Sequence, residues 1–137
     1  MRKFRAWDKN NEEMVKVIKI SYKYYSDGIK FITVQYKNNE TLTEYADSFE
    51  LMQYTGLKDK NDKEIYEGDI VKGEVGFQGK VMKVKGQVKY THCRFVIAEW
   101  NCSLFQFSND FAGGGFWIEK IGNKYENPEL LEADDHD

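Results

Sequence analysis

Hydrophobic and polar residues alternate over short stretches of this chain, a pattern typical of strands in a sheet with one exposed face. Such stretches occupy residues 14–20, 29–36, 81–90 and 95–100. Glycine, asparagine or aspartate separates them roughly every 8–12 residues, as in β-sandwiches and small barrels. Asp27-Gly28 lies between two aromatic and β-branched runs, which predicts a β-hairpin because the central residues of a type I′ turn need positive φ.

We therefore predict a mainly β fold, in which a short-stranded β-rich N-terminal part packs on a small SH3-like barrel, with little helix. The predicted divisions are 1–65 for the N-terminal part, 66–131 for the barrel and 132–137 for an acidic tail. Asn127 and Pro128 predict a short C-terminal helical turn, with asparagine as N-cap and proline at the first helical position.

Two segments allow more than one interpretation. For residues 47–53 we favour a short helical turn capped by Asp47 or Ser48, although the spacing of apolar residues fits a strand equally well. Gly86 interrupts the alternation of residues 81–90. We expect it to permit a turn there, because glycine adopts backbone conformations that other residues avoid.

The composition agrees with a sheet protein. Aromatic residues make up 15 % of the chain, with nine Tyr, nine Phe and three Trp, and aromatic side chains suit half-buried strands. The chain has 20 basic and 23 acidic residues, and four of the acids lie within the last six positions. The remaining body is almost neutral, so charge gives no support to strong non-specific nucleic-acid binding, which requires a basic face.

Metal-binding patterns are incomplete. The run that starts at Asp59 resembles the beginning of a calcium loop, but Glu64 replaces the required glycine and Ile70 the bidentate glutamate. His92 and Cys93 are adjacent and would point to opposite faces of a strand, and Cys102 is the other cysteine. A structural zinc site needs four ligands, so we expect two ordinary strand cysteines, no metal and no cofactor.

Catalytic patterns are also weak. The chain contains no P-loop, no H-E-x-x-H helix motif and no serine nucleophile elbow. Glu67 and Asp69 flank Gly68 and could act as paired acids in a cleft. Acids beside a glycine before a strand more often accept hydrogen bonds from turn amides. We therefore expect a non-enzymatic protein, and an enzyme would need Glu67, Asp69 or Cys93 in a concave pocket.

The main alternative is a nucleic-acid-binding barrel that uses the region 80–95. Small barrels bind single strands by combining a basic groove with stacking aromatic rings. The residues that could do so are Lys83, Lys85, Lys89, Tyr90 and Arg94. The structural interpretation is that these lysines are solvated and protect a strand edge, while the aromatic residues fill the core. The near-neutral body favours that interpretation, and hence a protein partner over nucleic acid.

Three blocks of the chain resemble the YopX proteins of bacteriophages and prophages. They are Lys3–Asp8 (KFRAWD), Leu51–Val71 and Ile121–Leu131 (IGNKYENPELL). One departure is Asn61-Asp62, where that family usually has Asn-Gly; we expect the loop to persist because aspartate tolerates the left-handed conformation. The family has no established activity, so the resemblance transfers no catalytic residue.

The resemblance implies a phage- or prophage-encoded protein that acts in the cytoplasm of a bacterial host. The first residues lack the apolar segment of a secretory signal, and no apolar run is long enough to cross a membrane. We expect a binding or assembly module whose partner is a phage or host protein or a second copy of the chain. The sequence does not identify the partner.

Overall fold

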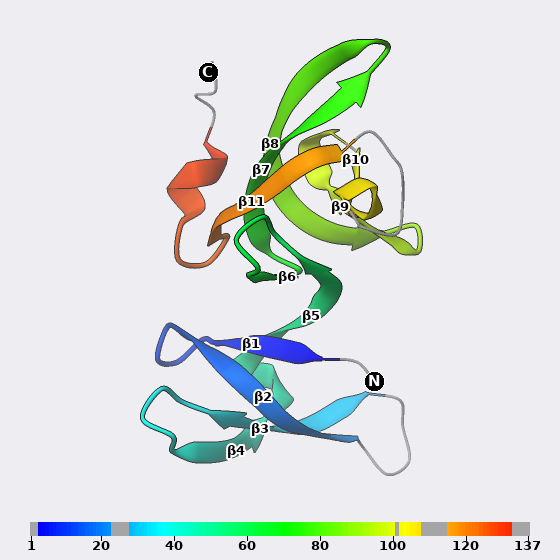
Figure 1. The fold of residues 1–137 in the computed structure, drawn as a ribbon. Coiled ribbons are helices and arrows are strands. Elements are labelled where there is room, and N and C mark those ends of the chain that lie inside the picture. Colours follow the sequence, from blue (N-terminus) through cyan, green and yellow to red (C-terminus); the bar gives the residue numbers. More distant parts are fainter. Residues whose placement is uncertain (1–2, 23–27, 101, 108–114, 133–137) are drawn as a thin grey trace. The chain divides into compact units, whose positions relative to one another are not determined.

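The computed structural model describes residues 3–22, 28–100, 102–107 and 115–132. Within these ranges the chain consists of β-strands and short 3₁₀ turns and contains no α-helix (Figure 1), which confirms the predicted mainly β class. Internal contacts divide the chain into two compact units, Met1–Gln53 and Tyr54–Asp137. The observed boundary lies after Gln53, whereas the predicted boundary lies after residue 65.

The first unit is an antiparallel sheet. Its strands are β1 (Phe4–Asp8), β2 (Glu13–Tyr22), β3 (Ile29–Gln35), β4 (Thr41–Tyr45) and the first half of β5 (Phe49–Lys58). Strands β1 to β4 pair in succession, and β5 returns to pair with β1 after a 3₁₀ turn at Ala46–Ser48. Alternate residues of these strands form the core, which contains Ala6, Val15, Ile32, Val34 and Phe49.

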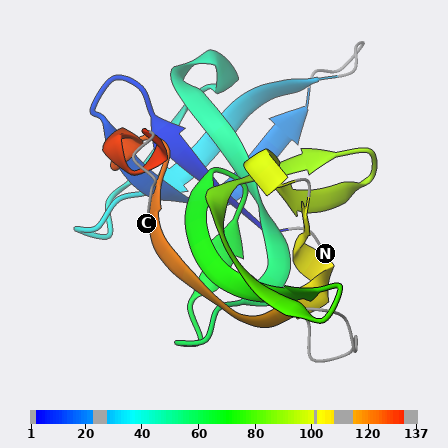
Figure 2. The ribbon, with the colours of Figure 1, turned by 90° about the horizontal axis from the view of Figure 1, so that it is seen from above.

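The second unit repeats this connectivity, although the sequence shows no repeat. Its strands are the second half of β5, β6 (Glu64–Tyr66), β7 (Asp69–Phe77), β8 (Lys80–Thr91), β9 (Arg94–Ile97), β10 (Cys102–Ser103) and β11 (Gly115–Asn123). Strands β7 to β10 pair in succession, a 3₁₀ turn at Leu104–Phe107 follows, and β11 returns to pair with β7 (Figure 2). Further 3₁₀ turns occupy Ala98–Trp100 and Pro128–Leu131.

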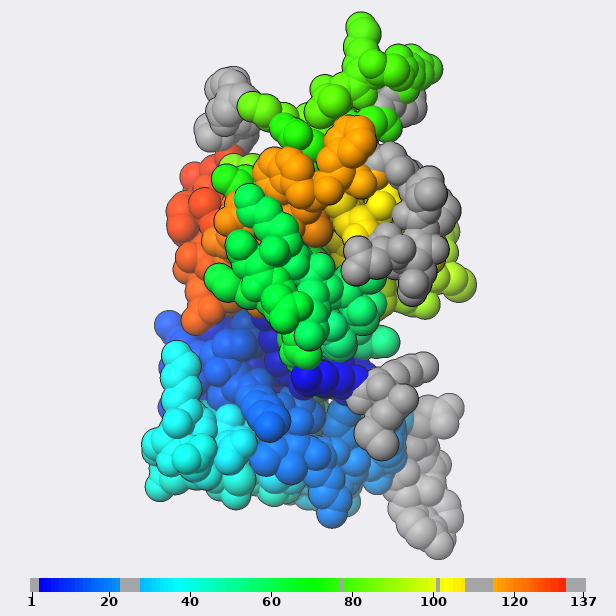
Figure 3. Space-filling view, viewed as in Figure 1, coloured from blue at the N-terminus to red at the C-terminus, as the bar shows by residue number. Residues whose placement is uncertain are grey.

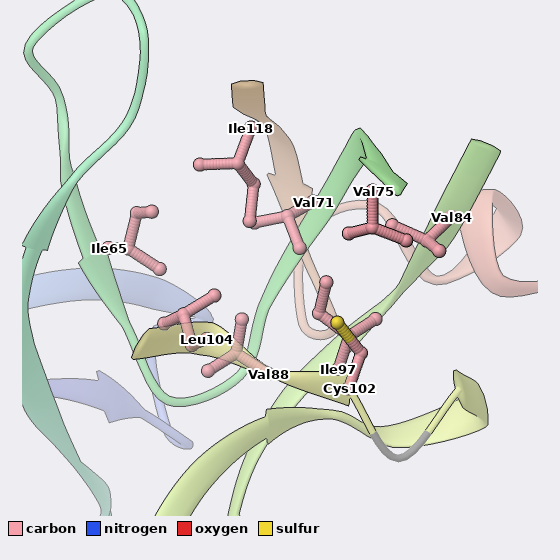
Figure 4. Packing of buried hydrophobic residues seen from close by; sticks show 9 residues of the cluster. All are labelled: Ile65, Val71, Val75, Val84, Val88, Ile97, Cys102, Leu104 and Ile118. Carbon is pink, nitrogen blue, oxygen red and sulfur yellow. The ribbon is translucent and has the colours of Figure 1, made fainter. Parts of the chain in front are cut away.

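The second sheet is open where a barrel was predicted. Its strand order is β10-β9-β8-β7-β11, and among the described residues β10 and β11 do not pair with each other. A closed SH3-like barrel over 66–131 is therefore not observed. The interior is nevertheless one apolar cluster: side chains from β6 to β11 converge in Figure 4, namely Ile65, Val71, Val75, Val84, Val88, Ile97, Cys102, Leu104 and Ile118.

Several local predictions were wrong for reasons of tertiary packing. Gly86 does not form a turn but lies within β8, where the Glu99 side chain occupies the space that a Cβ atom would need. Residues 49–53 form a strand instead of continuing the helical turn, because they pair with β1. The hairpin predicted around Gly28 is confirmed by the antiparallel pairing of β2 and β3, while Asp27 lies outside the described residues.

Two turns differ from their predicted form. His92 and Cys93 have φ of 50° and 66° and form the turn between β8 and β9, where they were expected in a strand. Asn127 precedes the predicted C-terminal turn, but its side chain makes no cap hydrogen bond. Its Oδ1 atom instead accepts a hydrogen bond from the Asn123 backbone N–H (3.2 Å), which holds the end of β11.

The loop at residues 58–63 covers the outer edge of β11. The Lys60 N–H donates to the Ile118 carbonyl (2.9 Å), and the Lys120 N–H donates to Asp59 Oδ2 (2.8 Å). Figure 3 shows this green loop lying against the orange strand. Asp62 has φ of 67°, so the expectation that aspartate adopts the left-handed conformation in this loop is confirmed.

Asp59 is the organising residue of this loop. It is buried, and its Oδ1 accepts hydrogen bonds from the Asn61 N–H (2.8 Å) and the Lys63 N–H (2.9 Å). Burial alone would raise the pKa of Asp59, but the backbone N–H groups of Lys120, Lys63 and Asn61 outweigh it and lower the pKa below the usual 3.8. The carboxylate is therefore ionised at neutral pH. Both of its oxygens accept hydrogen bonds from backbone N–H groups.

Replacing this carboxylate tests its structural role. Asp59→Asn exchanges one oxygen for an NH₂ group, so at least one backbone N–H now faces a donor. We expect the free energy of unfolding to fall by about 2 kcal/mol, because a charge-assisted hydrogen bond is lost in a buried place. Urea denaturation measures the change. The matched control is Asp62→Asn in the same loop, which removes only an exposed ion pair with Lys58 and should cost less than about 0.5 kcal/mol.

The lowered pKa of Asp59 also predicts a pH dependence. A group whose pKa is lower in the folded state stabilises the protein above its unfolded pKa, and that contribution is lost as the pH falls through the folded value. The stability difference between wild type and Asp59→Asn should therefore be constant from about pH 7 to pH 5 and shrink below about pH 4. Urea titrations at several pH values measure it; a difference that grows on acidification would contradict this assignment.

Candidate functional site

Four of the five residues predicted to bind nucleic acid share one face of the second sheet. Val84 and Val88 of β8 point into the core, so the alternation of the strand places Lys83, Lys85 and Lys89 on the opposite, exposed face. Arg94 of β9 pairs with Thr91 and lies on that same face. The face is therefore lined by basic residues along β8.

Acidic residues from neighbouring strands interrupt these bases. Lys83 pairs across the sheet with Glu74, and Lys85 pairs with Lys72. Lys72 in turn lies 3.9 Å from Glu119 of β11, measured between Nζ and Oε1. The charges thus partly compensate one another, so the face is only moderately basic.

Tyr90 lies on the opposite face of β8 from the lysines. Its ring packs edge-on against Phe95, its cross-strand partner, with centroids 4.9 Å apart. The structure therefore does not bring the predicted stacking ring together with the predicted cations. Trp117 pairs across the sheet with Glu74 and so lies on the lysine face, where its indole N–H donates to Glu74 Oε1 (3.0 Å).

The residues considered for catalysis lie in structural settings. Asp69 is fully buried, accepts a hydrogen bond from the Tyr66 N–H (2.7 Å), and forms an ion pair with Lys120 Nζ (3.3 Å). Glu67 belongs to the turn before β7, and Cys93 to the exposed turn after β8. Glu67 thus lies in a turn, Asp69 in a buried ion pair, and Cys93 at the tip of a hairpin.

In the described part of the first unit, Asp8 is a buried carboxylate. It accepts a hydrogen bond from the Tyr36 hydroxyl (2.7 Å) and others from Asn10 and Asn11 in the turn that follows β1. Burial would raise the pKa of Asp8, but these hydrogen bonds outweigh it and lower the pKa. Burial and the neighbouring Asp8 raise the pKa of Tyr36 to about 12. Both groups thus keep their charge state at neutral pH, as structural groups do.

The second unit has an open groove that the sequence did not indicate. Its volume is about 460 Å³, and its walls come from the end of β5, the turn at Leu104–Phe107 and the start of β11. Its apolar lining is formed by Tyr54, Leu57, Phe107, Phe116 and Trp117. Phe116 is 61 % exposed, so most of its ring is accessible to a partner.

Two β-bulges shape this groove. The pairing of β11 with β7 shifts between Gly115 and Trp117, so Phe116 is the extra residue of a bulge. The pairing of β5 with β6 shifts between Tyr54 and Lys58, around Gly56, whose φ is 87°. A bulge re-aims the side chains beside it. Both irregularities thus direct apolar side chains to the same surface hollow.

Lys60 supplies a positive charge at the rim of the groove. Its ammonium lies 4.6 Å from the centroid of the Trp117 ring and 3.7 Å from Glu119 Oε1. A cation above an aromatic face is attracted by the ring quadrupole. Since the Lys60 N–H also binds the Ile118 carbonyl, backbone and side chain both fix this part of the rim.

Other kinds of site find no support in the part of the chain that the structure describes. Within it, no three histidine, cysteine, aspartate or glutamate side chains gather as metal ligands. Burial raises the pKa of the Cys102 thiol, although Arg94 acts in the opposite direction, so this thiol stays protonated at neutral pH. No helix in the described segments is long and apolar enough to span a membrane.

Sequence reasoning missed the groove because exposure is not visible in a sequence. Phe107, Phe116 and Trp117 surround a glycine-rich stretch, and this clustering was the available signal. Gly115 is needed where the turn at Leu104–Phe107 meets β11, because a Cβ atom there would collide with the Gln106 carbonyl. The close approach of these two segments packs the Phe107 ring against Gly115, the residue before Phe116.

Comparison with known proteins places the chain in a family. Residues 3–132 match the family model described as YopX protein. The crystal structure of protein EF1440 from Enterococcus faecalis is similar, with 27 % identity, a TM-score of 0.64, and coverage of 96 % of this chain and 99 % of that one. The structure of protein yopX from Bacillus subtilis is similar in fold, with 21 % identity, a TM-score of 0.55, and coverage of 95 % and 98 %.

No curated protein matches the chain. The family match nevertheless extends over almost the whole sequence and includes all three blocks on which the resemblance was based. The chain belongs to the YopX protein family.

Proposed function

We propose that this chain is a phage- or prophage-encoded, non-enzymatic binding module of the bacterial cytoplasm, and that its groove in the second unit takes an apolar side chain of a protein partner. The observation that carries the proposal is the pair of bulges that directs Leu57 and Phe116 into one hollow. Bulges are frequent beside functional sites, and exposed aromatic residues are typical of protein-binding hot spots.

The dimensions and lining of the groove favour a side chain on an extended segment. A volume of about 460 Å³ lies in the lower part of the range of binding pockets, roughly 300–1,000 Å³. The lining combines aromatic and aliphatic side chains with four charged residues, Lys58, Asp59, Lys60 and Asp62. We infer that the occupant is an aromatic or large aliphatic side chain that stacks on Phe116 and Trp117.

The state of the acids supports a non-enzymatic role. Asp8 and Asp59 have lowered pKa values and accept several hydrogen bonds each, while Asp69 is paired with Lys120. A general acid or base at neutral pH usually has a pKa shifted toward 7. The return of β11 to β7 after the turn at Leu104–Phe107 supports an SH3-like strand order in the second unit, with an open sheet.

The groove proposal predicts a selective loss of binding. A library of random peptides of about twelve residues, selected on the full chain, should enrich sequences with a shared aromatic or large aliphatic residue. Fluorescence anisotropy should then show that Phe116→Ser weakens binding at least about tenfold, since truncating a hot-spot ring commonly costs more than 1.4 kcal/mol.

Phe105→Ser is the matched control, because Phe105 is 51 % exposed and is not part of the groove lining. It should change the affinity by less than about twofold. Equal losses in both variants, or no enrichment of any apolar residue, would refute the groove as the binding site.

Nucleic-acid binding is the second candidate, favoured by the common face of Lys83, Lys85, Lys89 and Arg94. It predicts retention of single- or double-stranded oligonucleotides at about 50 mM salt that falls steeply toward about 200 mM. A double variant with Lys83→Gln and Lys85→Gln should show a weaker salt dependence of oligonucleotide binding. The control double variant in the first unit, Lys9→Gln with Lys37→Gln, should not. Filter binding measures it, and absence of retention at low salt removes this candidate.

A further inference from the structure

The four edges of the two sheets differ in how they are protected from pairing with another strand. Unpaired edges invite association, and natural proteins shorten, cover or charge them. β6 has three residues and β10 only two. β11 is long, but the 58–63 loop covers it through the Lys60 N–H and the Asp59 carboxylate. Three of the four edges are therefore short or covered.

The fourth edge, β4, is not covered within the described residues, and its charged side chain is a single glutamate, Glu44. It has the sequence Thr-Leu-Thr-Glu-Tyr, with neither lysine nor proline. Its register with β3 runs without a shift from Thr41 to Tyr45, so no bulge twists it away. Figure 1 shows β4 at the end of its sheet, beyond β3. This edge is regular and rich in residues that favour strands.

The backbone of β4 presents hydrogen-bonding groups outward. The Tyr36 N–H donates to the Glu40 carbonyl (2.9 Å), so these residues form a hydrogen-bonded pair at the end of the β3–β4 hairpin. Bonded and non-bonded pairs alternate along an antiparallel ladder. Residues 40, 42 and 44 therefore bond to β3, while Thr41 and Thr43 direct their N–H and C=O groups away from it.

The edge strand β4 also exposes two large apolar side chains to solvent. Leu42 pairs with Val34 and lies on its core side, yet it remains 41 % exposed. Tyr45, on the other face, is 62 % exposed, and its ring packs against Phe31 with centroids 4.9 Å apart. The apolar surface of the sheet thus continues to its outer strand on both faces.

We propose that β4 pairs antiparallel with β4 of a second copy of this chain, about a two-fold axis through Thr43. This pairing places Thr43 opposite Thr43, Thr41 opposite Tyr45 and Leu42 opposite Glu44. It opposes no like charges, and it satisfies the outward groups of Thr41 and Thr43. The same patch of both copies forms the contact, as in other two-fold dimers.

Charge selects this register over its neighbours. A shift that centres the axis on Leu42 would oppose Glu44 and Glu40, and one that centres it on Glu44 would oppose two glutamates. Like charges directly opposite are destabilising. Because a single short strand pair buries less than a standard interface, we expect a dissociation constant of roughly micromolar order.

Sedimentation velocity of the full chain between about 1 and 300 µM tests the proposal. Wild type should shift from monomer to dimer over this range. Thr43→Lys and Thr43→Glu should each weaken dimerisation at least about tenfold, since the axis brings two like charges together. An equimolar mixture of the two variants should restore the dimer, because position 43 then carries opposite charges.

Val81→Lys is the matched control: Val81 is 60 % exposed and belongs to β8 of the second unit, so this variant should dimerise like wild type. Circular dichroism verifies that each variant is folded. Hydrogen exchange of wild type offers a readout without substitution, since the amides of Thr41 and Thr43 should gain protection as concentration rises.

A wild-type monomer at about 300 µM would overturn the proposal. So would a mixture of the two charged variants that stays monomeric, or concentration-independent exchange at Thr41 and Thr43. Protection of β4 by a peptide from the groove selection, without self-association, would assign the edge to another chain. The groove variants lie in the second unit, so failure of this test leaves the proposed function standing, and the reverse also holds.

Discussion

The second unit depends on one buried carboxylate, Asp59. Its two oxygens bind three backbone N–H groups, two in its own loop and one on β11. Together with the bond from the Lys60 N–H to the Ile118 carbonyl, they attach the loop to the edge of β11. Phe116, Trp117 and Lys60 all lie on these two segments, so the same carboxylate also sets the shape of the groove.

The hydrophobic pattern predicted the strands well, because alternation reports directly on which face is buried. The β2–β3 hairpin followed from the turn predicted around Gly28 between two aromatic and β-branched runs. Predictions failed where a contact from elsewhere in the chain decided the outcome. Gly86 taken alone indicated a turn. In the structure the Glu99 side chain occupies the place of a Cβ atom at position 86, so only glycine fits there within β8.

The same limit applies to the candidate site. Alternation already implies that Lys83, Lys85 and Lys89 share a face and that Tyr90 does not. It does not reveal Glu74 and Glu119 among them, since these arrive through the register of β7 and β11. The groove was hidden for another reason: a bulge inserts one residue into a ladder, and no local pattern distinguished Phe116 from an ordinary strand residue.

The return of the last strand to the first has a consequence for synthesis of the chain. In each unit the ladder that completes the sheet joins segments far apart in sequence, and such non-local contacts form slowly. β1 can pair once residues 49–53 have left the ribosome, so the first sheet can assemble during translation. The second cannot be completed before Asn123, and until then β7 exposes an unpaired edge rich in valine, which is the period of greatest risk of aggregation.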